Sequence, residues 1–263
     1  MSTFVQELKT ELKPFLWWMF SLLLIVYFGL IKYENLLIPG FDINKLMDQF
    51  PKIILAVFGM LNIDVMSLDG YYSVIGYLNL LFMSIYGLRL GHALISREIS
   101  DQTYEFLFSK PISRSNVLIR KFLAHCFYLV LAVVLLSAVS MLSVLALGLK
   151  MEITTLIWTY GLIILLVSLL FYWLSAFLTS LLNNINLSVI LSTSLYFLFF
   201  ILSVLYDMLE NADVLRFLTP FKFFMANEII NQDIPSVFLI YSMFLILMLT
   251  YLTFISFKKK DLL

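Results

Sequence analysis

The sequence predicts an all-α polytopic membrane protein with six transmembrane helices, and three observations support this fold class. First, 62% of the 263 residues are hydrophobic and only 13% are charged, whereas an average soluble chain has about 25% charged residues. Second, the mean hydropathy is +0.99. Third, six apolar runs approach or exceed the length of about 20 residues that a helix needs to span a bilayer. This composition excludes a soluble enzyme, a disordered chain and a nucleic-acid-binding protein, and the single cysteine excludes a disulfide scaffold.

The first predicted element is an amphipathic helix over residues 1–14 that lies in the membrane interface. Thr3 and Gln6 have the spacing of a capping box, and apolar residues then recur at helical intervals, at Val5, Leu8, Leu12 and Phe15. Charged residues between them would face water. We expect Pro14 to mark the turn into the membrane, where the first span, residues 15–31, begins. An unstructured tail is the alternative interpretation of the first 14 residues.

The other apolar runs predict five further spans, at residues 71–88, 122–149, 153–182, 187–206 and 236–257. None of the runs alternates with a period of two, which disfavours a β-barrel. The six spans form a single transmembrane domain over residues 1–263. With both termini on the cytoplasmic side, 11 of the 17 Lys and Arg residues lie inside. Because basic residues favour the cytoplasmic side, this orientation is predicted.

Two long segments connect spans on the outer side. In the first, Asp42 and Pro51 are placed to begin short helices, so residues 42–60 are expected to form helices that rest on the outer leaflet. The second, residues 207–235, carries many apolar side chains around Pro220. It is too apolar to be freely solvated, and it is expected either to dip into the edge of the bilayer or to pack on the bundle.

The inner loop between the second and third spans combines apolar and charged residues in a helical pattern. Four apolar residues fall on one side of a helix, namely Ile95, Ile99, Phe106 and Leu107, while acidic and other polar residues occupy the rest. Pro111 ends this helix, and Ser113 can cap the next one. From the residues alone, the simplest interpretation is a solvated loop helix with basic flanks at the interface.

This loop resembles that of the membrane-spanning permease subunits of the type-2 ABC exporter family, whose pattern is roughly E-x-x-x-G-T-x-E-x-L-x-x-x-P-[IV]-S-R. The matching residues are Glu98, Thr103, Glu105, Leu107, Pro111, Ile112, Ser113 and Arg114. One position departs from the pattern, because Gln102 stands where the family usually has glycine. Two outer stretches also look like those of a bacterial subgroup, Phe58-Gly59-Met60 and Leu218-Thr219-Pro220-Phe221.

The resemblance implies that residues 95–110 contain a coupling helix, which docks on a separate cytoplasmic ABC ATPase subunit, present in two copies. Acidic residues would pair with basic groups of the ATPase, with apolar anchors beside them. The implied coupling residues are Glu98, Asp101, Thr103, Glu105, Phe106, Leu107, Pro111 and Arg114. ATP and Mg²⁺ would be bound by the ATPase, while a second permease subunit, identical or homologous, would complete the substrate path. The implied location is the bacterial cytoplasmic membrane.

The sequence gives no sign of catalysis or of a cofactor site. It contains no G-x-x-x-x-G-K-[ST] loop for nucleotide phosphates, no H-E-x-x-H and no G-x-S-x-G. Two histidines, His92 and His125, with no third ligand would make a poor zinc site. We therefore expect a chain that is not an enzyme and binds no metal.

Polar residues within the spans are candidates for the substrate path, although helix packing is the simpler interpretation. They are Asn79, Ser188, Ser192 and Thr193. Since no Asp, Glu, Lys or Arg lies near the middle of a span, the cargo is expected to be hydrophobic or amphipathic: a drug, a peptide or a lipid-like molecule. The alternatives are an ATP-independent secondary transporter or channel, which predicts a buried charge or an internal repeat, and an intramembrane enzyme.

Overall fold

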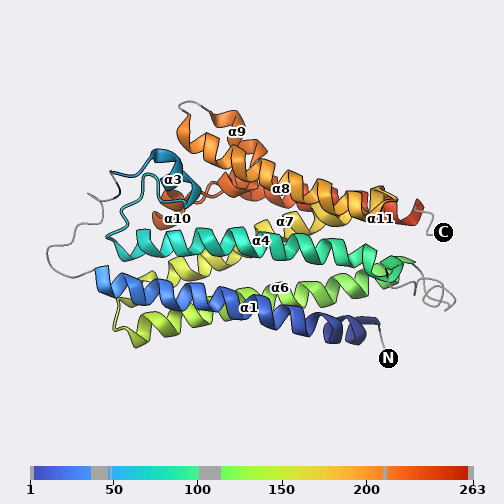
Figure 1. Ribbon diagram of the computed structural model, residues 1–263, viewed down its shortest axis with the longest axis horizontal. Helices are drawn as coiled ribbons and strands as arrows, with labels where there is room; N and C mark the ends of the chain where they lie inside the picture. Colours follow the sequence, from blue (N-terminus) through green and yellow to red (C-terminus); the bar gives the residue numbers. More distant parts are fainter. Residues whose placement is uncertain (1–2, 37–46, 48, 101–113, 210–211, 260–263) are drawn as a thin grey trace.

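The computed structural model describes residues 3–36, 47, 49–100, 114–209 and 212–259. Six long helices within this part of the chain run side by side in one bundle (Figure 1). They are α1 (Thr3–Leu36), α4 (Leu68–Ser100), α6 (Arg114–Ala146), α7 (Thr154–Leu181), α8 (Ile185–Met208) and α11 (Ser236–Lys259). Each is long and apolar enough to cross a membrane. The predicted class, an all-α polytopic membrane protein with six spans, is confirmed.

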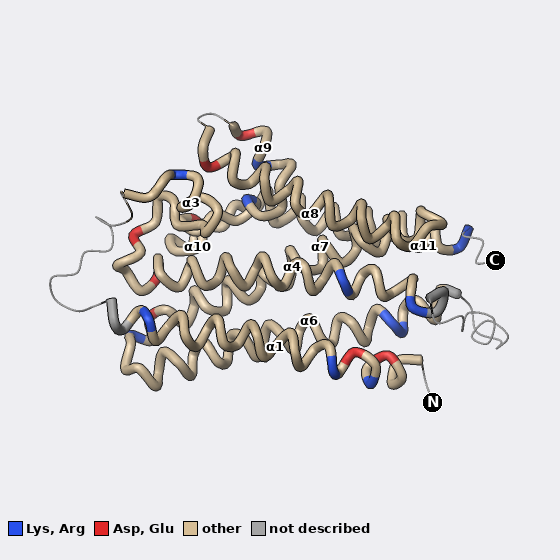
Figure 2. Tube along the Cα trace, in the orientation of Figure 1, with Lys and Arg blue, Asp and Glu red and all other residues tan. Residues whose placement is uncertain are grey.

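Both ends of the chain lie at the same end of the bundle (Figure 1). We call this the inner end and the opposite one the outer end. Figure 2 shows that most of the Lys, Arg, Asp and Glu residues are placed towards these two ends. This distribution fits a membrane protein, because a charged side chain at the centre of a bilayer is costly.

Helix α7 forms the centre of the bundle. It packs against α4, α6, α8 and α11, while α1 packs against α4 and α6 on the other side. Phe171, Tyr172 and Trp173 of α7 are buried. By contrast, large apolar side chains along α1, α8 and α11 are exposed on this single chain. Such surfaces are typical of helices that face lipid or another subunit.

The structure differs from the prediction at Pro14, where a turn was expected between an interfacial helix and the first span. Helix α1 instead runs without interruption through Pro14. Its buried residues in this region are Glu7 and Glu11, whereas Val5 and Leu12, on the predicted apolar face, are exposed. The reason is the ion pairing of the two glutamates with α4, together with the hydrogen bond between Glu7 and His125 of α6, which holds the segment against the bundle.

Helix α6 also differs slightly from the predicted third span, residues 122–149. It begins at Arg114 and ends at Ala146, and a short 3₁₀ helix, η1 (Met151–Ile153), leads into α7. Gly148 has a φ of 64°, in the left-handed region that glycine adopts without steric cost. Its N–H donates to the carbonyl of Leu145, so a helix end with a glycine just beyond it closes α6.

The outer end carries short elements from both outer segments. Helix α3 (Lys52–Val57) follows Pro51 in the first, of which residues 42–46 and 48 lie outside the described residues. The second contains α9 (Asp213–Leu218), η2 (Pro220–Lys222) and α10 (Ala226–Ile230).

Of the two alternatives for the second outer segment, the structure shows packing on the bundle. Phe221 of η2 is buried, with its ring centroid 5.2 Å from that of Phe171 and 5.4 Å from that of Tyr196. The hydroxyl of Thr219 donates to the carbonyl of Phe199 at 2.8 Å. Because Tyr196 lies midway along α8, the connection between α8 and α11 reaches well below the outer end of the bundle.

Candidate functional site

Most of the predicted coupling residues lie outside the described part of the chain. Within residues 101–113 these are Asp101, Thr103, Glu105, Phe106, Leu107 and Pro111. Glu98 belongs to the last turn of α4 and Arg114 begins α6, but both side chains also fall outside the description. Residues 95–100 of the predicted coupling helix continue α4. The structure therefore places the two helices that flank this segment, and the role of the segment stays a prediction.

Directly beside these flanks, the inner end of the bundle holds a largely buried group of charged and polar side chains, of which Arg89 is the most exposed. We call it the inner charged cluster. It consists of Glu7 and Glu11 of α1, Arg89 and Arg97 of α4, and Lys121 and His125 of α6. Glu11 and His125 have no exposed side-chain surface. Three helices that are far apart in the sequence meet here through their charges.

Two arginines of α4 hold the two glutamates of α1. The guanidinium of Arg97 contacts the carboxylates of both Glu7 and Glu11. Arg89 donates through Nη1 to Oε2 of Glu11 at 2.8 Å. Because Arg89 and Arg97 are eight residues apart, they lie on one face of α4, two turns from each other. The pairing joins α1 to α4 over the last turns of α4, where the predicted coupling helix begins.

His125 extends the network from α1 to α7. Its Nε2 lies 2.9 Å from Oε1 of Glu7, and its Nδ1 lies 3.2 Å from the hydroxyl of Tyr172. A neutral imidazole with its proton on Nε2 satisfies both contacts, since Nε2–H donates to the carboxylate while the Tyr172 hydroxyl donates to Nδ1. His125 thus connects α1, α6 and α7 without a net charge of its own.

Lys121 ties α6 to the backbone of α4. Its buried Nζ donates to the carbonyl of Leu94 at 2.8 Å and to that of Ala93 at 3.2 Å. Nearby, the Tyr128 hydroxyl donates to the carbonyl of Leu8. Together with the ion pairs, these bonds link α1, α4 and α6 to one another pairwise.

The cluster opposes two carboxylates with three basic side chains, so with a neutral His125 it carries a net charge of +1. Removing one partner of a buried ion pair typically costs about 3–5 kcal/mol, because the other charge is left buried and uncompensated. The arrangement therefore favours keeping all of its members in place, and the inner ends of the three helices are expected to move together.

Three members also have the chemistry of metal ligands. One ligand atom from each of Glu7, Glu11 and His125 lies within 4.8 Å of the others. However, the Arg97 guanidinium already contacts both carboxylates, and a cation placed between them would meet its positive charge. The geometry therefore describes an ion-pair network rather than a metal centre.

Our sequence interpretation missed this cluster, although two signals for it exist. Glu7 and Glu11 are four residues apart, as are Lys121 and His125, and each pair therefore occupies one face of its helix. The difficulty is that an acidic face on an amphipathic helix usually faces water. Here the acidic face meets basic residues of other helices.

Next to the cluster, α4 and α7 approach each other closely along two glycines. A Cβ on Gly91 would lie 1.9 Å from the carbonyl oxygen of Tyr172, and one on Gly87 would lie 2.3 Å from that of Ser168. No side chain fits between the two backbones at these points. The G-x-x-x-G spacing thus marks close helix packing, and this seam attaches α7 to the helix that leads into the predicted coupling segment.

The four predicted substrate-path residues lie in α4 and α8. The side-chain amide of Asn79 donates to the carbonyl of Ile75, while Ser188 and Ser192 donate to carbonyls of α8 itself. Thr193 is half-buried. None of the four lines the cavity described next, and their role in transport stays a prediction.

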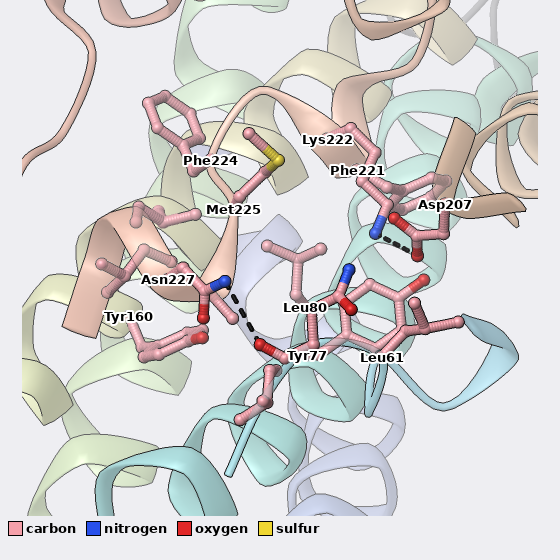
Figure 3. A pocket seen from close by; sticks show the side chains of 16 residues that line it. Leu61, Tyr77, Leu80, Tyr160, Asp207, Phe221, Lys222, Phe224, Met225 and Asn227 are labelled. Carbon is pink, nitrogen blue, oxygen red and sulfur yellow. Dashed lines mark hydrogen bonds and ion pairs between the residues drawn. The ribbon is translucent and has the colours of Figure 1, made fainter. Parts of the chain in front are cut away.

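The outer half of the bundle contains a cavity of about 100 Å³ beneath the two outer segments (Figure 3). Tyr77 of α4, Tyr160 of α7 and Asp207 of α8 line it together with η2 and the start of α10. The Nζ of Lys222 lies 2.6 Å from Oδ2 of Asp207, and both side chains are largely buried. Figure 3 shows the Tyr77 ring directed towards this ion pair. A second contact closes the other side, where Asn227 donates to the carbonyl of Asn62 at 3.2 Å.

Six long apolar helices, with most charges held at the two ends, define a multi-pass membrane protein. A comparison with known protein families matches residues 1–262 to the family described as ABC-2 family transporter protein. Since the match covers nearly the whole chain, the protein belongs to the ABC-2 family of transporter permeases, a membrane component that is not itself catalytic. The family predicted from the inner loop is thereby confirmed. No curated protein matches the chain.

Proposed function

We propose that the chain is the permease subunit of an ATP-driven exporter. Two copies of a separate cytoplasmic ATPase would bind ATP and Mg²⁺, and their closure would act on residues 101–113 of each permease subunit. The observation that carries the proposal, beyond membership of the family, is the inner charged cluster. It lies at the inner ends of α4 and α6, the two helices between which the predicted coupling residues are found.

The inner charged cluster and the close α4–α7 contact at Gly87 and Gly91 would transmit a movement of residues 101–113 into the bundle. A push on the segment reaches α4 and α6 directly, and the ion pairs of Glu7 and Glu11 pass it to α1. The close contact at Gly91 passes it to α7. In this mechanism α1, α4, α6 and α7 move as one body, and such rigid-body motion is a common form of alternating access.

The cargo in this proposal is hydrophobic or amphipathic, because the middle turns of the spans carry no Asp, Glu, Lys or Arg. A second permease subunit, a second copy of this chain or a homologue, would face the first across the substrate path. The exposed apolar surfaces of α1, α8 and α11 supply the area for lipid and for that subunit.

Co-purification and ATP hydrolysis test the proposal. We expect the tagged chain to retain an ABC ATPase from its own cell, and Glu98→Lys with Glu105→Lys to loosen that complex by reversing two charges of the predicted coupling helix. The matched control is Lys258→Glu with Lys259→Glu, which also reverses two charges, at the exposed inner end of α11. If the first pair leaves ATPase retention and turnover unchanged, the coupling assignment is wrong.

The second candidate is an ATP-independent secondary transporter, and the buried Glu7, Glu11 and His125 are the observation that favours it, because proton-coupled transporters use such groups. It predicts cargo movement in vesicles that contain no ATP, driven by a proton gradient. The ATPase-coupled proposal predicts movement only when the ATPase partner and ATP are both present.

A further inference from the structure

The Asp207–Lys222 ion pair of the outer cavity joins a fixed carboxylate to a side chain on a short connection. Asp207 lies near the end of α8, a helix of 24 residues, whereas Lys222 is the last residue of the three-residue helix η2. The two elements belong to different parts of the fold, and the long Lys222 side chain can leave Asp207 by rotation about its own bonds while the backbone of η2 stays bonded to Arg216. The carboxylate of Asp207 is therefore fixed in a span, whereas the ammonium of Lys222 lies at the end of a flexible side chain that a second cation can displace.

The surroundings of Asp207 favour a positive charge. The Nζ of Lys222 lies 5.8 Å from the ring centroid of Tyr77, within the range in which a ring attracts a cation. Tyr160, Phe221 and Phe224 add further rings to the lining. The position of Asp207 in the last turn of α8 contributes as well, because the C-terminal end of a helix carries a partial negative charge.

The Tyr77 hydroxyl gives the cavity a further polar atom. It is buried and makes no hydrogen bond of ordinary geometry to the described residues, although the Ser203 side chain of α8 lies beside it. Tyr77 lies nine residues into α4, so at about 1.5 Å per residue it is about 13 Å from the outer end of that helix. The Tyr77 hydroxyl oxygen lies beside the Asp207 carboxylate and the Lys222 ammonium (Figure 3). It can accept a hydrogen bond from a donor that enters the cavity.

The size of the cavity limits what can enter. About 100 Å³ is room for a few water molecules or a small headgroup, because a water occupies about 30 Å³ in the liquid. A whole amphipathic molecule does not fit. The apolar remainder of a cargo would stay among the apolar side chains of the bundle or in lipid.

We propose that this cavity is a binding site for the ammonium headgroup of an amphipathic cargo, which displaces Lys222 from Asp207. The inference rests on the proposed function and names the cargo class for it, an organic cation with an apolar tail. The cargo ammonium donates to the carboxylate of Asp207 and to the Tyr77 hydroxyl, at the edge of the Tyr77 ring. Displacement of Lys222 removes one of the contacts between η2 and α8, while the Thr219–Phe199 hydrogen bond and the packing of Phe221 on Tyr196 stay in place.

The test is the binding of three matched amphiphiles to the full chain in phosphatidylcholine nanodiscs. Dodecylamine, dodecanol and dodecanoate share a tail and carry a positive, a neutral and a negative headgroup. Binding is measured as the amphiphile concentration that gives half of the maximal rise in the midpoint of thermal unfolding, since a ligand of the folded state stabilises it. We expect the amine to act at the lowest concentration.

Two variants should then change amine affinity in opposite directions. D207N removes the anion and should weaken amine binding about tenfold or more, while K222Q removes the competing cation and should strengthen it about tenfold. A pair with only a structural role predicts that both variants weaken binding or that neither does. The double variant D207N with K222Q leaves no unpaired charge, so it should fold even where a single variant folds poorly. It should bind the amine as weakly as D207N does.

The matched control is the ion pair of Arg89 and Glu11, at 2.8 Å, which lies at the inner end of the bundle and does not line the cavity. R89Q and E11Q should lower the unfolding midpoint and leave amine affinity unchanged. Equal affinity for the three amphiphiles, a preference for dodecanoate, or parallel effects of D207N and K222Q would each overturn the proposal. ATPase retention is measured separately, so loss of the cation site leaves the permease assignment standing.

Discussion

The Nδ1 atom of His125 lies 3.2 Å from the hydroxyl of Tyr172, so a histidine of α6 is bonded to the central helix α7. The carbonyl of the same tyrosine is the atom that Gly91 of α4 approaches most closely. Tyr172 is therefore in contact with α6 through its side chain and with α4 through its backbone. Changes at this one residue should be felt by all three helices.

Tyr172→Phe should destabilise the protein by about 1–3 kcal/mol. The change leaves the buried Nδ1 of His125 without its hydrogen-bond partner, and a buried unsatisfied polar atom has a cost of this size. The measurement is the midpoint of thermal unfolding in nanodiscs. Tyr251→Phe is the control, because Tyr251 is exposed, and an equal loss for both variants would contradict the role given to the His125 contact.

Arg97→Gln should cost more, about 3–5 kcal/mol, since it leaves the carboxylates of Glu7 and Glu11 buried with fewer positive partners. In the assembled transporter it should also lower cargo-stimulated ATP hydrolysis, because α1 would no longer follow α4. Arg120→Gln removes the same charge from an exposed position of α6. Similar stability and ATP turnover for these two variants would contradict the proposal that the inner charged cluster couples α1 to α4.

Gly91→Ala should destabilise the bundle by about 1–3 kcal/mol, the usual cost of overpacking, because its Cβ would meet the backbone of α7. Gly29→Ala offers a direct comparison. A Cβ there meets only the end of the Ile75 side chain, at 2.8 Å, which can rotate away. Unfolding midpoints should fall further for Gly91→Ala than for Gly29→Ala, and the reverse order would exclude a rigid seam between α4 and α7.

Phe221→Ala should detach η2 from the bundle. We expect a loss of about 3 kcal/mol, the lower end of the range for a buried Phe, because lipid rather than water solvates much of the unfolded chain. Limited proteolysis from the outer side should then cut the segment between α8 and α11 faster. Phe217→Ala, at a more exposed position of the same segment, should change the cleavage rate less.

The six spans could be predicted because lipid imposes one strong requirement, a run of about 20 apolar residues, on each of them. The G-x-x-x-G at Gly87 and Gly91 is a signal of the same kind, since two backbones can approach closely only where side chains are absent. In both cases the pattern of a single helix is enough. Neither inference needs knowledge of which helices are neighbours.

The inner charged cluster could not be derived in this way. The pattern around Glu7 and Glu11 is the same whether the acidic face meets water or meets Arg97, so periodicity alone leaves the two arrangements equivalent. Pro14 adds to the difficulty, because contacts with α4 and α6 compensate for the hydrogen bond that proline removes. The depth of Phe221 likewise depends on which rings of α7 and α8 surround it, and those contacts join residues far apart in the sequence.

The unbroken course of α1 has a consequence for how much of the protein stands outside the bilayer. At about 1.5 Å per residue, 34 residues extend about 50 Å, whereas the hydrocarbon core is about 30 Å thick. If the apolar run from Phe15 to Ile31 occupies that core, the turns that carry Glu7 extend beyond it along the helix axis rather than lying flat on the lipid. An ATPase that approaches the segment between α4 and α6 would then also meet the first turns of α1. These two parts of the chain would form one docking surface.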